Sequence, residues 1–248
     1  MGDSVATIYI NGILSPKDET HWDSMRVALE RSLGGDVYHI HNPFIAVNQQ
    51  DIVRMVAENP HLAITFAAIS FSSLAFLASS SDDTAMKSLE FIAKGLEGVL
   101  RERAVSFQSE IIEGLEHILS NNAAEHLKSG SKRYERINIF AHSHGGMCID
   151  EFLKSDVPKE LQEKYGIELA VYVGGCPVIV SSHSSDVKEL VQIHNHNDVL
   201  SLLFSKSNSA RSLPETVIST YLDGNHDSLL YAEAIEEVLF SVRFESEL

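Results

Sequence analysis

INIFAHSHGG, residues 137–146, predicts a buried β-strand that runs directly into a tight turn and then a helix. The first half of this stretch is rich in β-favouring apolar residues, and Ser143 follows with His142 and His144 on either side. A strand-turn-helix junction holds a serine hydroxyl at the carboxyl edge of a sheet, where an imidazole can take its proton. Gly145 supplies the small residue that such a turn needs beside the serine. We therefore expect an activated serine at this junction.

The residues around Ser143 also suit the negative charge that develops when a carbonyl group is attacked. The backbone N–H of His144 can point at an oxyanion, and the amino end of the following helix adds partial positive charge. On such a turn the side chains of His142 and His144 would diverge around the serine. Ala141 stands where this type of turn usually has its first glycine, which is a sterically mild substitution.

The run from Ala141 to Gly145 resembles the nucleophile turn of the α/β-hydrolase superfamily, in its lipase and esterase branch. The resemblance implies an α/β fold with a mostly parallel central sheet flanked by helices. It also implies a serine hydrolase that cleaves a carboxylic ester through an acyl-enzyme on Ser143, with no metal and no cofactor.

Length and composition are typical of one acidic globular domain. The 248 residues, of which 44% are hydrophobic, can bury one large core, so we expect a single domain over residues 1–248. A net charge of -16 argues against nucleic acid and against an anionic membrane surface as electrostatic partners. Cys148 and Cys176 lie far apart without C-x-x-C spacing, which fits a reducing compartment. No leader precedes the strand-like residues from Val5 onward, so we expect a cytoplasmic location.

The segment VATIYI, residues 5–10, predicts a strand that ends at Asn11, Gly12 and Ile13. In the resembled family, a loop after an early strand supplies the second oxyanion N–H. Asn11 and Gly12 form the matching loop, and we expect Ile13 to be the donor. Gly12 would let the backbone approach a substrate closely, although an ordinary turn glycine remains the alternative.

Residues 51–130 are predicted to form a helical insertion, and its most apolar part is Leu62 to Ala78, which contains no charged residue. This part is slightly shorter than the roughly 20 residues of a membrane span and has no Lys or Arg at its flanks. The pattern therefore favours either a helix buried in the core or a lid over the active site, and it does not distinguish between these two alternatives. A lid would expose this surface to a lipid or an acyl chain, with transient membrane contact.

The resemblance also implies where the partners of Ser143 lie. The triad acid of the resembled fold follows the second strand beyond the nucleophile strand, and Asp198 follows the predicted strand 190–194. The triad histidine follows the last strand, which is the position of His226. The chain order Ser143, Asp198, His226 is the order of that fold. His226 would be the general base and Asp198 would orient it, with Asp186 as an alternative acid.

A metal-dependent hydrolase is the alternative suggested by the run His194-Asn195-His196-Asn197-Asp198. This H-x-H-x-D spacing helps bind two metal ions in metallo-β-lactamase-like hydrolases, and histidines two apart can share an ion. Here Val199 replaces the expected final histidine, and only 50 residues follow Asp198, too few for that fold's later ligands. We therefore predict no metal site; a zinc or manganese requirement would favour the alternative.

The predicted function is hydrolysis of a carboxylic ester, and a small-molecule or lipid ester is the expected substrate. A thioesterase or an acyltransferase of the same fold is the second possibility. A non-catalytic protein that binds a lipid or a partner is a third, because the same fold hosts binding proteins without turnover.

Overall fold

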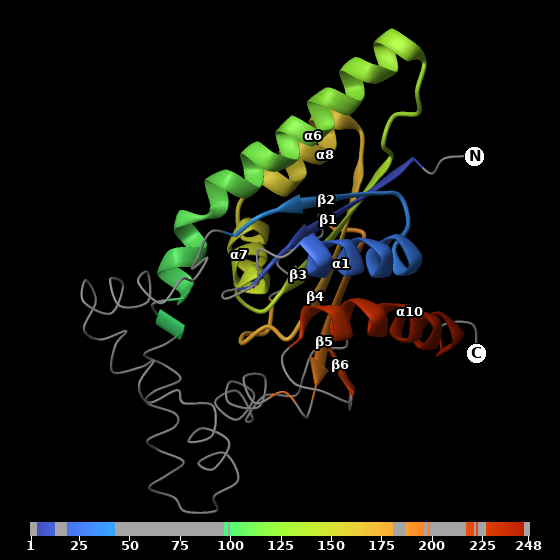
Figure 1. Cartoon of the computed structure of the whole chain (residues 1–248). Coiled ribbons are helices and arrows are strands. Elements are labelled where there is room, and N and C mark those ends of the chain that lie inside the picture. The colour runs from blue at the N-terminus through green and yellow to red at the C-terminus, as the bar shows by residue number, and fades with distance from the viewer. Residues whose placement is uncertain are drawn as a thin grey trace, which may run out of the picture.

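The computed structural model describes residues 4–12, 19–42, 97–98, 100–180, 187–195, 198, 217–220, 222 and 227–245. Its centre is a six-stranded sheet in which all five neighbouring pairs are parallel (Figure 1). The strand order across the sheet is β2-β1-β3-β4-β5-β6. The strands are β1 (Val5–Ile10), β2 (Asp36–Ile40), β3 (Arg136–His142), β4 (Glu168–Gly174), β5 (Glu189–Asn195) and β6 (Val217–Thr220).

The sequence of each strand fits its place in the sheet. β1, β3 and β4 are central and almost wholly buried, and they are near-continuous apolar runs, as expected for strands covered on both faces. β2 lies at the edge and buries only one residue fully. The apolar runs therefore reflect helices packed on both sides of the sheet.

Five described helices form the two outer layers: α1 (Glu19–Ser32), α6 (Gln108–Ser129), α7 (His144–Leu153), α8 (Val157–Tyr165) and α10 (Ser228–Glu245). α1 and α10 contact each other on one face of the sheet, and α6, α7 and α8 contact one another on the opposite face (Figure 1). A further helical segment, residues 100–106, leads into α6.

Alternate side chains of each strand enter different cores. Ile8 and Ile139 belong to the core under α6, α7 and α8, whereas their neighbours Tyr9 and Phe140 belong to the core under α1 and α10. Burying one such side chain stabilises the fold by about 1.5–3 kcal/mol. The second core also contains Met25 and Leu29 of α1, Tyr172 of β4, and Tyr231 and Ile235 of α10.

The predicted α/β architecture, a parallel central sheet flanked by helices, is confirmed and is consistent with an α/β-hydrolase fold. Leu62–Ala78 lies outside the described residues, so the lid, and the division into one domain with an insertion at residues 51–130, stay predictions. Within the described ranges, no helix is both long and apolar enough to cross a membrane.

Candidate active site

Ser143 stands at the junction of β3 and α7 in a strained backbone conformation. Its φ is 56° and its ψ is -122°, and it is the one non-glycine residue of the described chain with a positive φ. Such a conformation costs about 1–3 kcal/mol and persists only where the surroundings enforce it. Here the Ser143 N–H donates to the carbonyl of Gly174 at 2.9 Å, and the Gly146 N–H donates to the Ser143 carbonyl at 3.0 Å. The sharp turn expected from the sequence is therefore present.

Two glycines allow the end of β1 to approach this turn. A Cβ atom on Gly12 would lie 2.6 Å from the Ser143 Cβ and 3.2 Å from its Oγ. A Cβ atom on Gly145 would lie 2.5 Å from the carbonyl oxygen of Ile10. Neither position has room for a side chain, so the serine side chain lies directly against the backbone of Gly12.

The same place is the switch point of the sheet. Ile10 at the end of β1 pairs with Ala141 near the end of β3. From β1 the sheet continues to β2 on one side and to β3 on the other, so the strand order reverses there. Open parallel sheets bind ligands outside the carboxyl ends of their strands at such a point. Ser143 and Gly12 are thus located where the topology itself favours a binding site.

The two histidines beside Ser143 diverge, as predicted. His144 is buried on the α6 side, where its Nε2 lies 2.8 Å from the carbonyl oxygen of Leu100 and its Nδ1 lies 2.9 Å from Nδ2 of Asn42. An amide donor at Nδ1 and a carbonyl acceptor at Nε2 define a neutral ring protonated at Nε2. Burial lowers the pKa of His144, opposed by the bond to Leu100. The ring of His142 instead lies 5.5 Å from that of Tyr231 in α10.

A buried amide network fixes the loop that carries Gly12. Asn11 Oδ1 accepts hydrogen bonds from the Asn42 backbone N–H at 2.8 Å, and it lies 2.8 Å from His39 Nε2. Asn11 Nδ2 donates to the carbonyl oxygens of Gly12 at 2.8 Å and Asn42 at 3.2 Å. Through the contact of Asn42 with His144, the network joins the ends of β1 and β2 to the start of α7.

Ion pairs attach α7 to the helical segment 100–106. Asp150 of α7 is 2% exposed, and its Oδ2 lies 3.1 Å from Nη1 of Arg101 and 2.7 Å from Nζ of Lys154. A buried carboxylate needs such partners, because desolvation penalises an unpaired charge. These contacts hold Leu100 where its carbonyl can accept from His144.

Asp198, the predicted triad acid, is fully buried just after β5. Its backbone N–H donates to the carbonyl of Asn195 at 3.1 Å, and its Oδ2 accepts a hydrogen bond from the Tyr231 hydroxyl at 2.5 Å. Tyr231 thus contacts both the carboxylate and the ring of His142, next to Ser143. Periodicity in the sequence does not reveal these contacts of Tyr231, because the residue occupies an apolar position of an amphipathic helix.

The structure brings Asn11, Gly12, Ser143 and His144 together at the carboxyl ends of β1 and β3, and it places Asp198 after β5. The other predicted site residues, Ile13 and His226, lie outside the described residues, as do Asp186 and His196. Among the residues that are described, no three His, Cys, Asp or Glu side chains are grouped closely enough to hold a metal ion.

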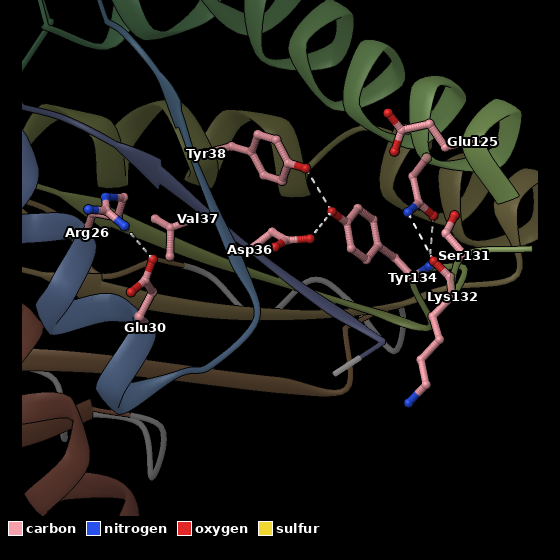
Figure 2. Close-up of a pocket in the computed structure, with 10 residues that line it drawn as sticks. Arg26, Glu30, Asp36, Val37, Tyr38, Glu125, Ser131, Lys132 and Tyr134 are labelled. Carbon is pink, nitrogen blue, oxygen red and sulfur yellow. Dashed lines mark hydrogen bonds and ion pairs between the residues drawn. The ribbon is translucent and has the colours of Figure 1, made fainter. Parts of the chain in front are cut away.

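A cavity lies away from this site, at the amino end of β2. It is an open cavity of about 680 Å³. Figure 2 shows Tyr38, Tyr134 and Asp36 pointing toward one another there, with the Tyr134 hydroxyl donating to Asp36 Oδ2 at 2.6 Å and 2.7 Å from the Tyr38 hydroxyl. Arg26 in the same cavity pairs with Glu30 at 2.9 Å. Five polar side chains of this cavity thus pair with one another.

Comparisons with known proteins leave the family open. No protein-family model matches the chain, and no curated protein sequence matches it. A solved structure titled "Crystal structure of PytH_H230A" is similar over 98% of this chain and 98% of that chain, with 9% identity and a TM-score of 0.37. At that TM-score the likeness adds no argument to the strand order and site geometry described above.

Proposed function

We propose that the protein is a serine hydrolase of the α/β-hydrolase type, which cleaves a carboxylic ester through an acyl-enzyme on Ser143. One observation carries the proposal: a serine stands in a strained, positive-φ conformation at the carboxyl end of β3, at the amino end of a helix and against Gly12. Strain of this kind clusters at functional sites, and a nucleophile at a strand-to-helix turn is its best-known use.

In the proposed reaction, the Ser143 hydroxyl attacks the ester carbonyl while His226 takes its proton. The backbone N–H groups of His144 and Ile13 stabilise the oxyanion of the tetrahedral intermediate. His226 then returns the proton to the leaving alcohol, and water releases the acyl group by the reverse sequence. Asp198 orients the imidazole and stabilises its charged form. The burial of Asp198, just after β5, supports this role, because a desolvated carboxylate acts strongly on a nearby imidazolium.

The proposed substrate is a small-molecule or lipid ester. Support comes from the resemblance to lipases and from the uncharged sequence of Leu62–Ala78, which would line an acyl site or contact a membrane transiently. A thioester substrate, or transfer of the acyl group to an alcohol instead of water, would use the same nucleophile. We propose that the reaction takes place in the cytoplasm and needs neither a metal nor a cofactor.

The test is the intact mass of the protein after exposure to a fluorophosphonate. We expect one adduct on the wild-type protein and none on Ser143→Ala, with the same far-UV circular dichroism for both. An unmodified wild type, or equal modification of both proteins, would contradict the proposal. Either result would favour a protein that binds a ligand without turnover. Ligand binding by Ser143→Ala equal to that of the wild type, in a protein that hydrolyses nothing, would favour the same alternative.

The acid is tested separately. We expect Asp198→Asn to lower turnover of a p-nitrophenyl ester by orders of magnitude while binding changes little. Near-normal turnover in Asp198→Asn, with a large loss in Asp186→Asn, would transfer the role of the acid to Asp186.

A further inference from the structure

Tyr231 makes a direct contact with the proposed triad acid. Its hydroxyl lies 2.5 Å from Oδ2 of Asp198, and neither residue is exposed to solvent. A hydrogen bond from a phenol to a carboxylate is charge-assisted, and such bonds are shorter and about twice as strong as neutral ones. Its geometry is therefore well suited to hold the carboxylate in one orientation.

The ring of Tyr231 has little freedom to move. A Cβ atom on Gly174 would lie 2.6 Å from the Tyr231 Cβ, so the tyrosine packs directly on the backbone at the end of β4. The carbonyl of that same Gly174 accepts the hydrogen bond of the Ser143 N–H at 2.9 Å. On its other side the ring lies 5.5 Å from the ring of His142. Tyr231 therefore packs both on Gly174, which accepts the hydrogen bond of the Ser143 N–H, and against His142, the residue before Ser143.

Tyr231 is also close in sequence to the proposed general base. It lies in the first turns of α10, which begins at Ser228, two residues beyond the proposed base His226. One side chain therefore links the start of α10 to Asp198 and to the end of β4. A fixed carboxylate matters for catalysis because small displacements of catalytic groups lower the rate steeply.

We propose that Tyr231 is a positioning residue, which acts through Asp198 by holding its carboxylate in the orientation that the general base requires. This inference rests on the proposed serine hydrolase function. Tyr231 does not touch the substrate; its effect reaches Ser143 through Asp198 and the histidine.

Tyr231→Phe is the direct test, because it removes the hydroxyl and keeps the ring that packs on Gly174. The matched control is Tyr134→Phe, which removes the hydroxyl of another buried tyrosine, one that donates to the carboxylate of Asp36 at the far edge of the sheet (Figure 2). We expect the rate of fluorophosphonate labelling to fall about 10- to 100-fold in Tyr231→Phe, because the loss of a charge-assisted hydrogen bond corresponds to a change of this size. The control stays within about twofold of the wild type. With p-nitrophenyl butyrate, the loss appears in kcat and leaves KM nearly unchanged.

A double variant separates positioning from packing. In an Asp198→Asn background, Tyr231→Phe is expected to change the labelling rate by less than about twofold, because its route to Ser143 is already broken. If the double variant instead lowers the labelling rate by the product of the two single effects, Tyr231 acts through packing and the proposal is wrong. Thermal unfolding of each variant, followed by circular dichroism, confirms that rates are compared between folded proteins.

The two proposals fail in different ways. If the wild type is labelled at Ser143 and Tyr231→Phe is labelled equally fast, the positioning role is refuted and the hydrolase stands. If the folded wild type is never labelled, the hydrolase and the positioning role are refuted together.

Discussion

Gly12 and Ser143, at the ends of two neighbouring strands, lie so close together that no side chain larger than the hydrogen of glycine fits at position 12. The Cβ position of Gly12 is 2.6 Å from the Ser143 Cβ. Real Cβ atoms do not approach so closely, so the serine would have to move.

We therefore expect Gly12→Ala to lower fluorophosphonate labelling of Ser143 by about 100-fold, since a displacement of about 1 Å at a reacting group has an effect of that size. Gly98→Ala is the control, because a Cβ atom there meets nothing within 4 Å and the residue is exposed in a helix. Labelling of Gly12→Ala at the wild-type rate would show that the serine turn adapts to the extra methyl group.

Backbone strain at Ser143 predicts an order of stability between two variants that remove the proposed nucleophile. Glycine adopts a positive φ without a steric penalty, whereas alanine keeps the Cβ that causes it. We expect Ser143→Gly to unfold at a higher urea concentration than Ser143→Ala, with a free energy of unfolding larger by about 1 kcal/mol. If alanine were equally stable, the conformation at this position would not be strained.

The buried amide of Asn42 predicts a loss of stability on truncation. Asn42→Ala removes the donor that contacts His144 Nδ1 at 2.9 Å and the Asn11 carbonyl at 3.3 Å. Leaving such groups unsatisfied costs about 1–3 kcal/mol, measured as the free energy of unfolding in urea. The control is Asn121→Ala, whose hydrogen bond to His117 is exposed, with an expected change within about 0.5 kcal/mol.

His144 predicts a dependence of stability on pH. Burial lowers its pKa in the folded state, so below about pH 6.5 the unfolded chain takes up a proton that the folded protein refuses. The contribution of the neutral His144 to the free energy of unfolding is therefore complete above pH 6.5. It is lost as the pH falls, with a slope of at most about 1.4 kcal/mol per pH unit. We expect the difference in unfolding free energy between wild type and His144→Gln to shrink from pH 7 to pH 5. A constant difference would mean that His144 titrates normally in the folded protein.

The two cysteines are expected to be inert in the folded protein. Both are buried, and burial raises the pKa of both thiols, to about 12 for Cys176. Alkylation requires the thiolate, so iodoacetamide at neutral pH will modify neither cysteine until the protein is unfolded in urea. Intact mass distinguishes the two states, and rapid modification of the native protein would contradict the described burial.

Local sequence patterns were enough to predict the sheet. The strands before Gly12 and Ser143 are apolar runs bounded by turn residues, and such runs have few alternatives to a buried strand. The turn at Ser143 was equally visible, because a small-His-Ser-x-Gly run concentrates its signal in five residues. The place of Asp198 after the fifth strand followed from the element order, whereas its role as the triad acid stays a prediction.

Contacts between distant side chains could not be predicted. Tyr231 has the spacing of a core residue, and nothing in α10 indicates that its hydroxyl reaches a carboxylate beyond β5. In the same way Asn42 resembles an ordinary residue before a proline, although it contacts His144 of another element. Such pairings depend on how the layers pack, and periodicity carries no information about which polar tips will meet.

The parallel ladder between β1 and β3 has a consequence for synthesis of the chain. Val5 pairs with Arg136, so the ribosome must add more than a hundred residues before β1 meets this partner. At about 5–20 residues per second, that interval is on the order of ten seconds. During it β1 can pair with β2 alone, and a two-stranded unit is marginal in water while its open apolar edge can recruit other nascent chains. The yield of folded protein will therefore depend on how quickly translation passes from β2 to β3.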